Sequence, residues 1–152
     1  MLYQFLCRGE RLILAIWVGG LLSIGYIATP VLFSLLDSKQ LAGQLAGQMF
    51  FVMNIIGFVC GGLLLALAGV LKQGVWYKER RVLVLVVMLS IVAVASFVLQ
   101  PLMQDLKANG LIPGSEEAKA FGRMHGISSI LYLINSLLGI FLVMMARPIK
   151  AC

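Results

Sequence analysis

Charged side chains are absent from four long stretches of this chain, and their absence limits what it can fold into. The 12 Lys and Arg residues and the 6 Asp and Glu residues all lie outside segments 12–36, 40–71, 82–104 and 124–146. A helix needs roughly 20 apolar residues to cross the hydrocarbon core of a bilayer, and each segment is longer than that. We therefore predict an all-α integral membrane four-helix bundle. It would be a single transmembrane domain over residues 1–152, with helices at about 12–36, 41–71, 82–104 and 122–146.

Composition supports this class and excludes others. Hydrophobic residues make up 61% of the chain and charged residues 12%, whereas a soluble domain has roughly 45–50% and about 25%. Disordered chains have low hydrophobicity, so that class is excluded as well. No nucleotide-binding loop, catalytic motif or multi-ligand metal site stands out, and we expect a protein that is not an enzyme and carries no cofactor.

Basic residues are distributed unequally between the two ends of the predicted bundle. With four spans, both termini and the connection between the second and third helices share one side. That side holds most of the basic residues, namely Arg8, Arg11, Lys72, Lys78, Arg80, Arg81, Arg147 and Lys150. Because positively charged loops stay in the cytoplasm, we expect a multi-pass protein of the bacterial inner (plasma) membrane with cytoplasmic N- and C-termini. The net charge of +6 then reflects topology, and we expect no nucleic-acid partner.

The first and third helices carry a proline at the same end. Pro30 precedes Asp37, and Pro101 precedes Asp105. Proline removes a backbone N–H and kinks a helix. We interpret the pattern as two tandem helical hairpins that splay at the prolines, and the alternative is that each proline only marks a helix end. Before the fourth helix, a serine followed by two glutamates predicts a short outer-loop helix at about 115–121.

Small residues predict where the helices approach one another. In lipid, helices associate through close packing of small residues. The second helix supplies two Gly-x-x-x-Gly pairs, Gly43 with Gly47 and Gly57 with Gly61. We predict helix packing there, and we expect the lipid bilayer and a homo-oligomer or membrane partner as the interacting species.

Polar side chains gather in the halves of the helices expected to point away from the cytoplasm. In a bundle they would line an outward-facing pocket that binds or passes a small solute or metal ion. The alternative is a structural or partner-binding subunit, in which they only form interhelical hydrogen bonds worth roughly 0.6–2 kcal/mol each. The candidate pocket residues are Pro30, Asn54, Gln100, His125, Ser128 and Tyr132.

His125 is the chain's one histidine and its candidate for titration near neutral pH. Four roles stay open for this side chain: a proton relay, a metal ligand, a substrate contact or a purely structural hydrogen bond. Zinc requires about four nitrogen or sulfur ligands, so we predict no dedicated metal site. Because Cu(I) accepts thioether sulfur, the weak metal candidates are His125, Met49, Met53 and Met124.

Three segments carry a resemblance to a known family: Thr29-Pro-Val-Leu-Phe33, Gly47-Gln-Met-Phe50 and Phe121-Gly-Arg-Met-His125-Gly-Ile-Ser128. With them the chain resembles the bacterial membrane family similar to human transmembrane protein 205. That family is catalogued as a domain of unknown function and is similar in layout to copper-resistance membrane domains. The resemblance implies a four-helix inner-membrane protein that handles a metal or small solute. The matching positions are Pro30, Phe33, Gly43, Gly47, Phe50, His125 and Ser128.

The chain departs from that pattern at one point. The resemblance implies an asparagine within about two helical turns after the histidine, and here Tyr132 intervenes before Asn135. The departure puts a shared polar site in doubt.

Overall fold

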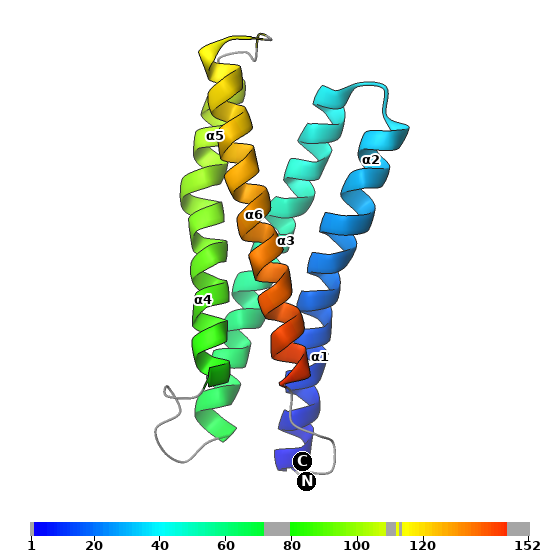
Figure 1. The fold of residues 1–152 in the computed structure, drawn as a ribbon. Coiled ribbons are helices and arrows are strands. Elements are labelled where there is room, and N and C mark those ends of the chain that lie inside the picture. The colour runs from blue at the N-terminus through cyan, green and yellow to red at the C-terminus, as the bar shows by residue number, and fades with distance from the viewer. Residues whose placement is uncertain (1, 72–79, 109–111, 113, 146–152) are drawn as a thin grey trace.

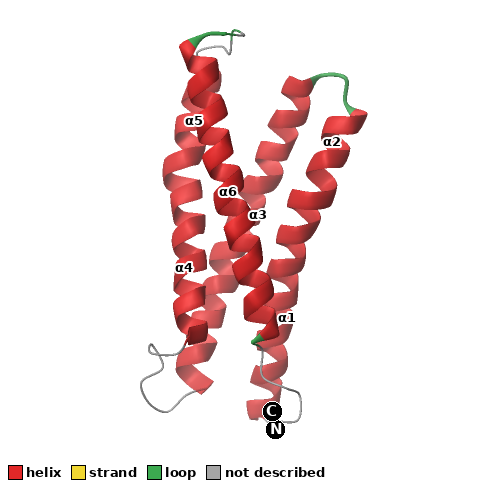
Figure 2. Cartoon of the chain, viewed as in Figure 1, coloured by secondary structure: helices red, strands yellow, loops and turns green. Residues whose placement is uncertain are grey.

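The computed structural model describes residues 2–71, 80–108, 112 and 114–145, and these residues form helices without any strand (Figures 1 and 2). Two of the segments, η1 and η3, are π-helical and continue the helices on either side of them. The predicted all-α class is confirmed. In chain order the elements are α1 (Leu2–Ser23), η1 (Ile24–Ala28), α2 (Thr29–Leu35), α3 (Lys39–Leu71), α4 (Arg80–Val94), η3 (Ala95–Leu99), α5 (Gln100–Ala108) and α6 (Glu116–Met144).

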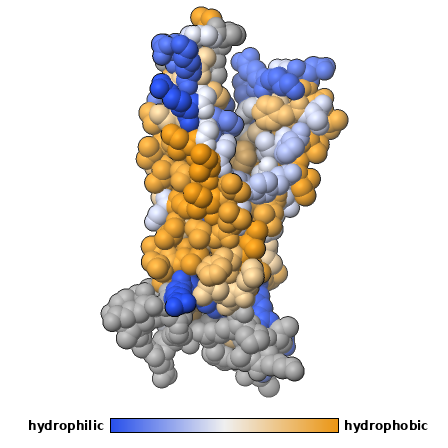
Figure 3. All heavy atoms as spheres, in the orientation of Figure 1, coloured by the Kyte–Doolittle hydropathy of each residue, from blue (hydrophilic) through white to orange (hydrophobic). Residues whose placement is uncertain are grey.

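Among the residues that the structure describes, four continuous helical rods are long and apolar enough to cross a membrane. The rods are Gln4–Leu35, Lys39–Val70, Arg80–Lys107 and Glu116–Met144, and the mean hydropathy of their most apolar windows runs from 2.0 to 3.1. Figure 3 shows apolar side chains covering the middle of the molecular surface, with hydrophilic residues at its ends. The chain is therefore a multi-pass membrane protein with four transmembrane helices, as predicted.

Helix ends differ from the predicted ones in two places. α1 begins at Leu2 rather than near residue 12, so its first turns are charged and extend beyond the apolar part. The short helix expected at 115–121 is the first part of α6, which runs unbroken from Glu116. Ser115 caps this helix by accepting a hydrogen bond from the backbone N–H of Ala118 at 3.1 Å. Because the chain stays helical from this cap to Met144, one helix forms where the sequence suggested two.

The four rods are arranged as two hairpins. The first hairpin consists of α1, η1, α2 and α3, and the second consists of α4, η3, α5 and α6. α1 and α4 each pack against both α3 and α6, whereas α2 packs on α3 and α5 packs on α6. Figure 1 accordingly shows the two hairpins standing apart at the end where each of them turns. We call this end the hairpin end.

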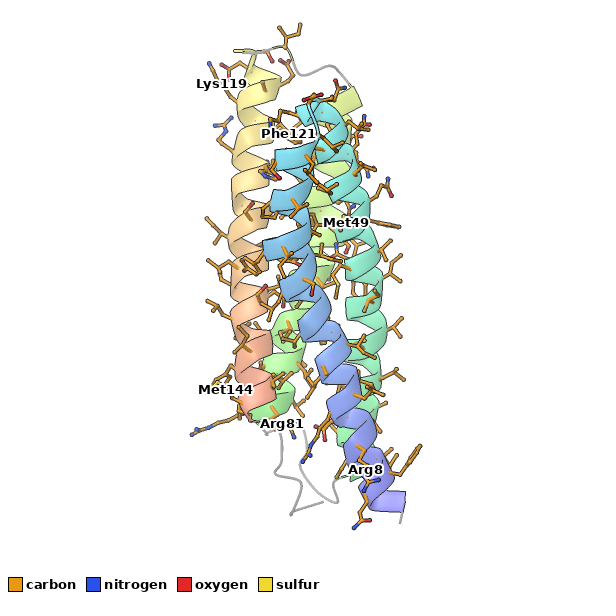
Figure 4. All side chains as sticks on the ribbon, turned by 90° about the vertical axis from the view of Figure 1, so that its right-hand side faces the viewer. Arg8, Met49, Arg81, Lys119, Phe121 and Met144 are labelled. Atoms are coloured by element: carbon orange, nitrogen blue, oxygen red, sulfur yellow. The ribbon has the colours of Figure 1, made fainter. Side chains whose placement is uncertain are left out.

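The opposite end is closed by an ion pair between the two hairpins. Arg81 of α4 lies 2.7 Å from the carboxylate of Glu10 of α1, and both side chains are largely buried, at 16% and 17% exposure. Figure 4 shows Arg8 and Arg81 at this end and Lys119 at the other. We call it the ion-pair end. Of the basic residues that predict orientation, Lys72, Lys78, Arg147 and Lys150 lie outside the described residues.

Large apolar side chains and glycines build the core. Trp17, Met53, Met88 and Leu142 are almost completely buried in one cluster. A Cβ atom on Gly57 would lie 3.1 Å from the indole nitrogen of Trp17. The missing side chain thus lets the tryptophan of α1 lie directly on α3.

Candidate functional site

Each π-helical segment ends two residues before one of the prolines that the sequence analysis singled out, Pro30 and Pro101. In an α-helix each N–H bonds to the carbonyl four residues earlier. Here the N–H of Thr29 bonds to the carbonyl of Ile24, and the N–H of Gln100 bonds to the carbonyl of Ala95, five residues earlier in each case. The next residue in each helix, Pro30 or Pro101, has no N–H to donate. Each hairpin therefore widens its proline-bearing helix by one residue at the same place.

This shift leaves one backbone carbonyl in each helix without its usual donor. The carbonyl of Gly25 would accept from the N–H of Thr29, which bonds to Ile24 instead. The carbonyl of Ser96 would accept from the N–H of Gln100, which bonds to Ala95. In a helix such freed carbonyls are satisfied by side chains, waters or ligands.

Tyr132 of α6 lies where the two hairpins separate. Its hydroxyl donates a 2.7 Å hydrogen bond to the carbonyl of Leu21 in α1. Its ring packs on Gly25, where a Cβ atom would lie 2.3 Å from a ring carbon. The ring also meets Phe50 of α3 edge-on at 5.0 Å and lies 6.4 Å from Tyr26. Tyr132 therefore joins the two hairpins at the level where they begin to diverge, and we call this divergence towards the hairpin end the fork.

The Tyr132–Phe50 contact relates positions on α6 to positions on α3. Both helices begin at the hairpin end and run towards the ion-pair end (Figure 1). With a rise of about 1.5 Å per residue, His125 lies roughly 10 Å nearer the hairpin end than Tyr132. By the same rule Asn54 lies roughly 6 Å beyond Phe50, towards the ion-pair end. The predicted pocket residues thus spread over roughly 16 Å of bundle length rather than meeting at one level.

Three predicted pocket residues are half-buried without an engaged side chain. Asn54, Gln100 and Ser128 are each partly exposed, and no side-chain hydrogen bond joins them to any described residue. Pro30 is exposed on α2. Tyr132 is thus the one predicted pocket residue whose side chain the described structure ties to another helix by a hydrogen bond.

His125 belongs to an aromatic and cationic cluster at the hairpin end. Its exposed ring stacks on Phe121 one turn earlier, with ring centroids 6.1 Å apart and planes 11° apart. Lys107 of α5 places its ammonium group 5.4 Å from the centroid of the same Phe121 ring. Figure 4 shows Phe121 and Lys119 projecting from opposite sides of α6, with Phe121 towards the other helices. Sequence reasoning had not singled out Lys107 for this cluster.

The weak metal candidates are not brought together. Met53 is buried against Gly20, where a Cβ atom would lie 2.9 Å from its sulfur. From the register given by Tyr132, Met53 lies roughly 15 Å from the level of His125 along the bundle. Met49 and Met124 are half-buried. Among the described residues there is also no group of three or more His, Cys, Asp or Glu side chains that could hold a metal ion.

The predicted packing glycines divide into two groups. Gly57 and Gly61 are buried inside the bundle, against Trp17 and Leu89. Gly43 has only the Phe33 ring near it, at 3.9 Å from a Cβ position, and Gly47 has no atom within 4 Å. The second group therefore leaves an open place on α3.

Buried polar atoms that sequence reasoning did not select lie near the bundle centre. The Trp17 indole nitrogen, the Ser96 hydroxyl and the Asn135 side-chain oxygen are inaccessible and lack a hydrogen-bond partner among the described residues. Asn135 follows Tyr132 by three residues and so shares its face of α6, and this spacing was a signal in the sequence. Ser96 could be found by aligning the two proline sites, since it stands where the first hairpin has Gly25.

The chain belongs to a family described as a domain of unknown function (DUF4149), whose model matches residues 12–111. This match covers most of the first three transmembrane rods and confirms the expected membership of a family of unknown function. The resemblance to transmembrane protein 205 and to copper-resistance domains stays an expectation. No curated protein and no solved structure matches the chain.

Proposed function

We propose that the chain binds or passes a small solute between its two hairpins at the hairpin end, without catalysing a reaction. The fork carries this proposal. The hairpins pack together at the ion-pair end, whereas at the hairpin end α2 packs on α3 and α5 packs on α6. The proposed binding region begins at Tyr132, whose side chain contacts both α1 and α3.

The side chains around the fork suit a polar solute. Binding sites combine apolar walls with a few placed polar groups. Gln100 and Ser128 offer an amide and a hydroxyl group that no described side chain engages, and Asn54 adds an amide roughly 6 Å beyond Phe50, towards the ion-pair end. His125 and Lys107 lie nearer the hairpin end, and each of them contacts Phe121. From the distribution of basic residues we further propose that the hairpin end faces away from the cytoplasm of a bacterial inner membrane.

Water access to the fork tests the proposal directly. The three native cysteines are first replaced by alanine, and single cysteines are then introduced at Ser128 and at Ile130. Ile130 is 60% exposed on the apolar surface of α6 and serves as the lipid-facing control. We expect a charged, membrane-impermeant thiol reagent to modify Ser128→Cys much faster than Ile130→Cys in reconstituted vesicles. Equal, slow modification of both would mean that no water-filled space exists there.

A second experiment tests whether His125 takes part in solute handling. Cells carrying the wild-type chain or His125→Ala are compared for growth on a panel of small solutes and copper salts. We expect His125→Ala to shift the tolerance of the host to at least one of them. The exposed neighbour Gly126 provides a control as Gly126→Ala, because no atom lies within 4 Å of a Cβ there. Normal folding with unchanged tolerance in His125→Ala would contradict a functional role for this histidine.

The open glycines favour a second candidate, a structural subunit that packs against another membrane helix. Gly47 has nothing within 4 Å of a Cβ position, and small residues at i and i+4 allow close helix approach. Under this alternative, Gly47→Leu would change the oligomeric state in detergent. Under the solute proposal, Gly47→Leu would leave that state unchanged, and Ser128→Cys would still react from the aqueous side.

A further inference from the structure

The second π-helical segment has oxygen atoms that the described residues do not satisfy. The Ser96 hydroxyl and the Asn135 side-chain oxygen are both inaccessible and unpartnered. Asn135 is only 3% exposed. The Ser96 carbonyl adds a third oxygen, because the N–H of Gln100 bonds to Ala95 and Pro101 has no N–H. Buried polar groups without partners are rare, and an unseen ion or water is a common explanation.

Contacts between α6 and its neighbours place Ser96 and Asn135 at similar heights along the bundle. η3 packs against α6. Met88 lies against Gly139, and Lys107 lies over Phe121. In this antiparallel register Ser96 falls opposite residues 131 and 132, about one helical turn from Asn135. Side chains on a helix point back towards its N-terminus, so Asn135 points towards the level of Ser96.

Two further amides lie within about one helical turn of Ser96 along the bundle axis. Gln100 follows η3 directly and is half-buried. Asn54 is one turn from Gly57, which faces Val92 of α4 at 3.5 Å from a Cβ position. Both side chains carry a carbonyl oxygen. Neutral oxygen atoms that can act as ligands are therefore present on α3, α5, α6 and the π segment itself in this part of the bundle.

Neutral oxygens without matching donors suit a hard cation. Hard metal ions take carbonyl, amide and hydroxyl oxygens, and backbone carbonyls freed from helices coordinate such ions inside membranes. The four charge-free segments contain no Asp or Glu, so a divalent ion would lack the negative charge that it needs there. We propose that Ser96 and Asn135, assisted by the oxygens of Asn54 and Gln100, bind one monovalent metal cation such as Na⁺. The site shares Asn54 and Gln100 with the proposed solute site, but Ser96 and Asn135, which carry the cation proposal, are not among the groups assigned to the solute.

A water molecule is the competing occupant. The buried Trp17 indole N–H also lacks a partner among the described residues, and a water joining it to Asn135 would satisfy both groups. The two occupants respond differently to salt composition, because only a bound cation is lost when Na⁺ is replaced by choline at the same ionic strength.

The test uses the full chain purified in detergent without sodium. Thermal unfolding is followed in NaCl, KCl and choline chloride at equal ionic strength, and binding of ²²Na⁺ is measured directly. We expect one alkali ion to raise the melting temperature by about 2–4 °C over choline. We also expect ²²Na⁺ to bind at about one ion per chain and to be displaced by unlabelled Na⁺. Equal melting temperatures in all three salts and no displaceable ²²Na⁺ would overturn the proposal.

Variants separate the cation from the water. Ser96→Ala removes one ligand with little change in volume, and it should weaken ²²Na⁺ binding about tenfold or more and abolish the salt-dependent shift. Ser90→Ala is the matched control, because Ser90 is exposed on α4 and its hydroxyl bonds only to the Val86 carbonyl at 2.8 Å. It should retain both signals. If Trp17→Phe and Ser96→Ala change the melting temperature equally in NaCl and in choline chloride, the occupant is water and the cation site is wrong.

Discussion

The two π-helical segments occupy equivalent places in the two hairpins but have different surroundings. η1 lies beneath the Tyr132 ring, which packs on Gly25, and the Thr29 hydroxyl donates a 2.9 Å hydrogen bond to the Ile24 carbonyl. η3 has Ser96 where η1 has Gly25, and this hydroxyl has no partner among the described residues. Each widening frees one backbone carbonyl, but the side chains around it are packed and hydrogen-bonded in the first hairpin, whereas the Ser96 hydroxyl is unmatched in the second.

The difference assigns different physical roles to the two segments. Packing that fills every space holds one arrangement firmly, because filled cores resist small displacements. Unmatched polar groups can be satisfied in more than one way, by a ligand or by local movement. We infer that η1 is a fixed support for Tyr132 and that η3 is the segment whose conformation changes when a ligand binds in the bundle.

The largest expected effect comes from adding a methyl group at Gly25, where the Tyr132 ring packs directly on the helix. A Cβ atom there would lie 2.3 Å from a Tyr132 ring carbon, so Gly25→Ala must displace the ring and break its hydrogen bond to Leu21. We expect a loss of about 2–4 kcal/mol in the free energy of unfolding, from overpacking plus the lost bond. Unfolding by sodium dodecyl sulfate in mixed micelles measures it.

Gly19→Ala is the control for this substitution. No atom lies within 4 Å of a Cβ at Gly19, and alanine is favoured over glycine in a helix by up to about 1 kcal/mol. This variant should be neutral or more stable than the wild type. If Gly25→Ala were as stable as Gly19→Ala, the first π segment would not be the fixed element that its packing indicates.

Removing only the Tyr132 hydroxyl tests the polar part of the same contact. Tyr132→Phe keeps the ring on Gly25 and loses the 2.7 Å bond to the Leu21 carbonyl. Interhelical hydrogen bonds in membranes average about 0.6 kcal/mol and reach about 1.7, so we expect a loss of about 1 kcal/mol by the same assay. Tyr26→Phe is the matched control, because Tyr26 is 46% exposed, and it should change stability by less than about 0.5 kcal/mol.

Sequence alone predicted the four helices because the absence of charge over each span is a strong and local signal. It also predicted both prolines as perturbations of their helices. It did not predict the π segments, because a one-residue widening depends on which donor each carbonyl finds in three dimensions. Nor could it separate Gly57, buried under Trp17, from Gly47, which meets nothing. Both follow the same Gly-x-x-x-Gly spacing, and only the neighbouring helices distinguish them.

The candidate site was less predictable than the fold for a related reason. Tyr132 and Asn135 are three residues apart and share one face of the fourth helix, but their roles depend on height along the bundle. The contact between Tyr132 and Phe50 fixes the register of α6 against α3. In this register His125 and Met53 lie at different heights. The spacing of residues in the sequence specifies which face of a helix they share, whereas a binding site also requires residues of different helices to lie at the same height.

The ion pair at the ion-pair end tests whether the stability of one hairpin depends on contact with the other. Glu10 and Arg81 join α1 to α4 at 2.7 Å with both side chains largely buried. In a double-mutant cycle with Glu10→Gln and Arg81→Gln, we expect a coupling energy of about 1 kcal/mol, near the upper end for accessible pairs because burial reduces screening. The exposed pair of Lys119 with Glu116, at 2.8 Å, is the control and should give about 0.5 kcal/mol or less. Equal coupling in the two pairs would indicate that water reaches the ion-pair end freely.

The smallest effects compare the two π segments directly. Thr29→Val removes the hydroxyl that bonds to the Ile24 carbonyl and should lower the unfolding free energy by about 0.5–1 kcal/mol. Ser96→Ala removes a hydroxyl that has no partner among the residues the structure describes. In sodium-free buffer it should leave stability unchanged or raise it slightly, since deleting an unmatched buried polar group removes its desolvation cost. Opposite signs for the two variants would support the contrast between a satisfied and an unsatisfied segment. A loss for Ser96→Ala as large as that for Thr29→Val in sodium-free buffer would show that both segments are equally satisfied, and the distinction between fixed and responsive hairpins would then fail.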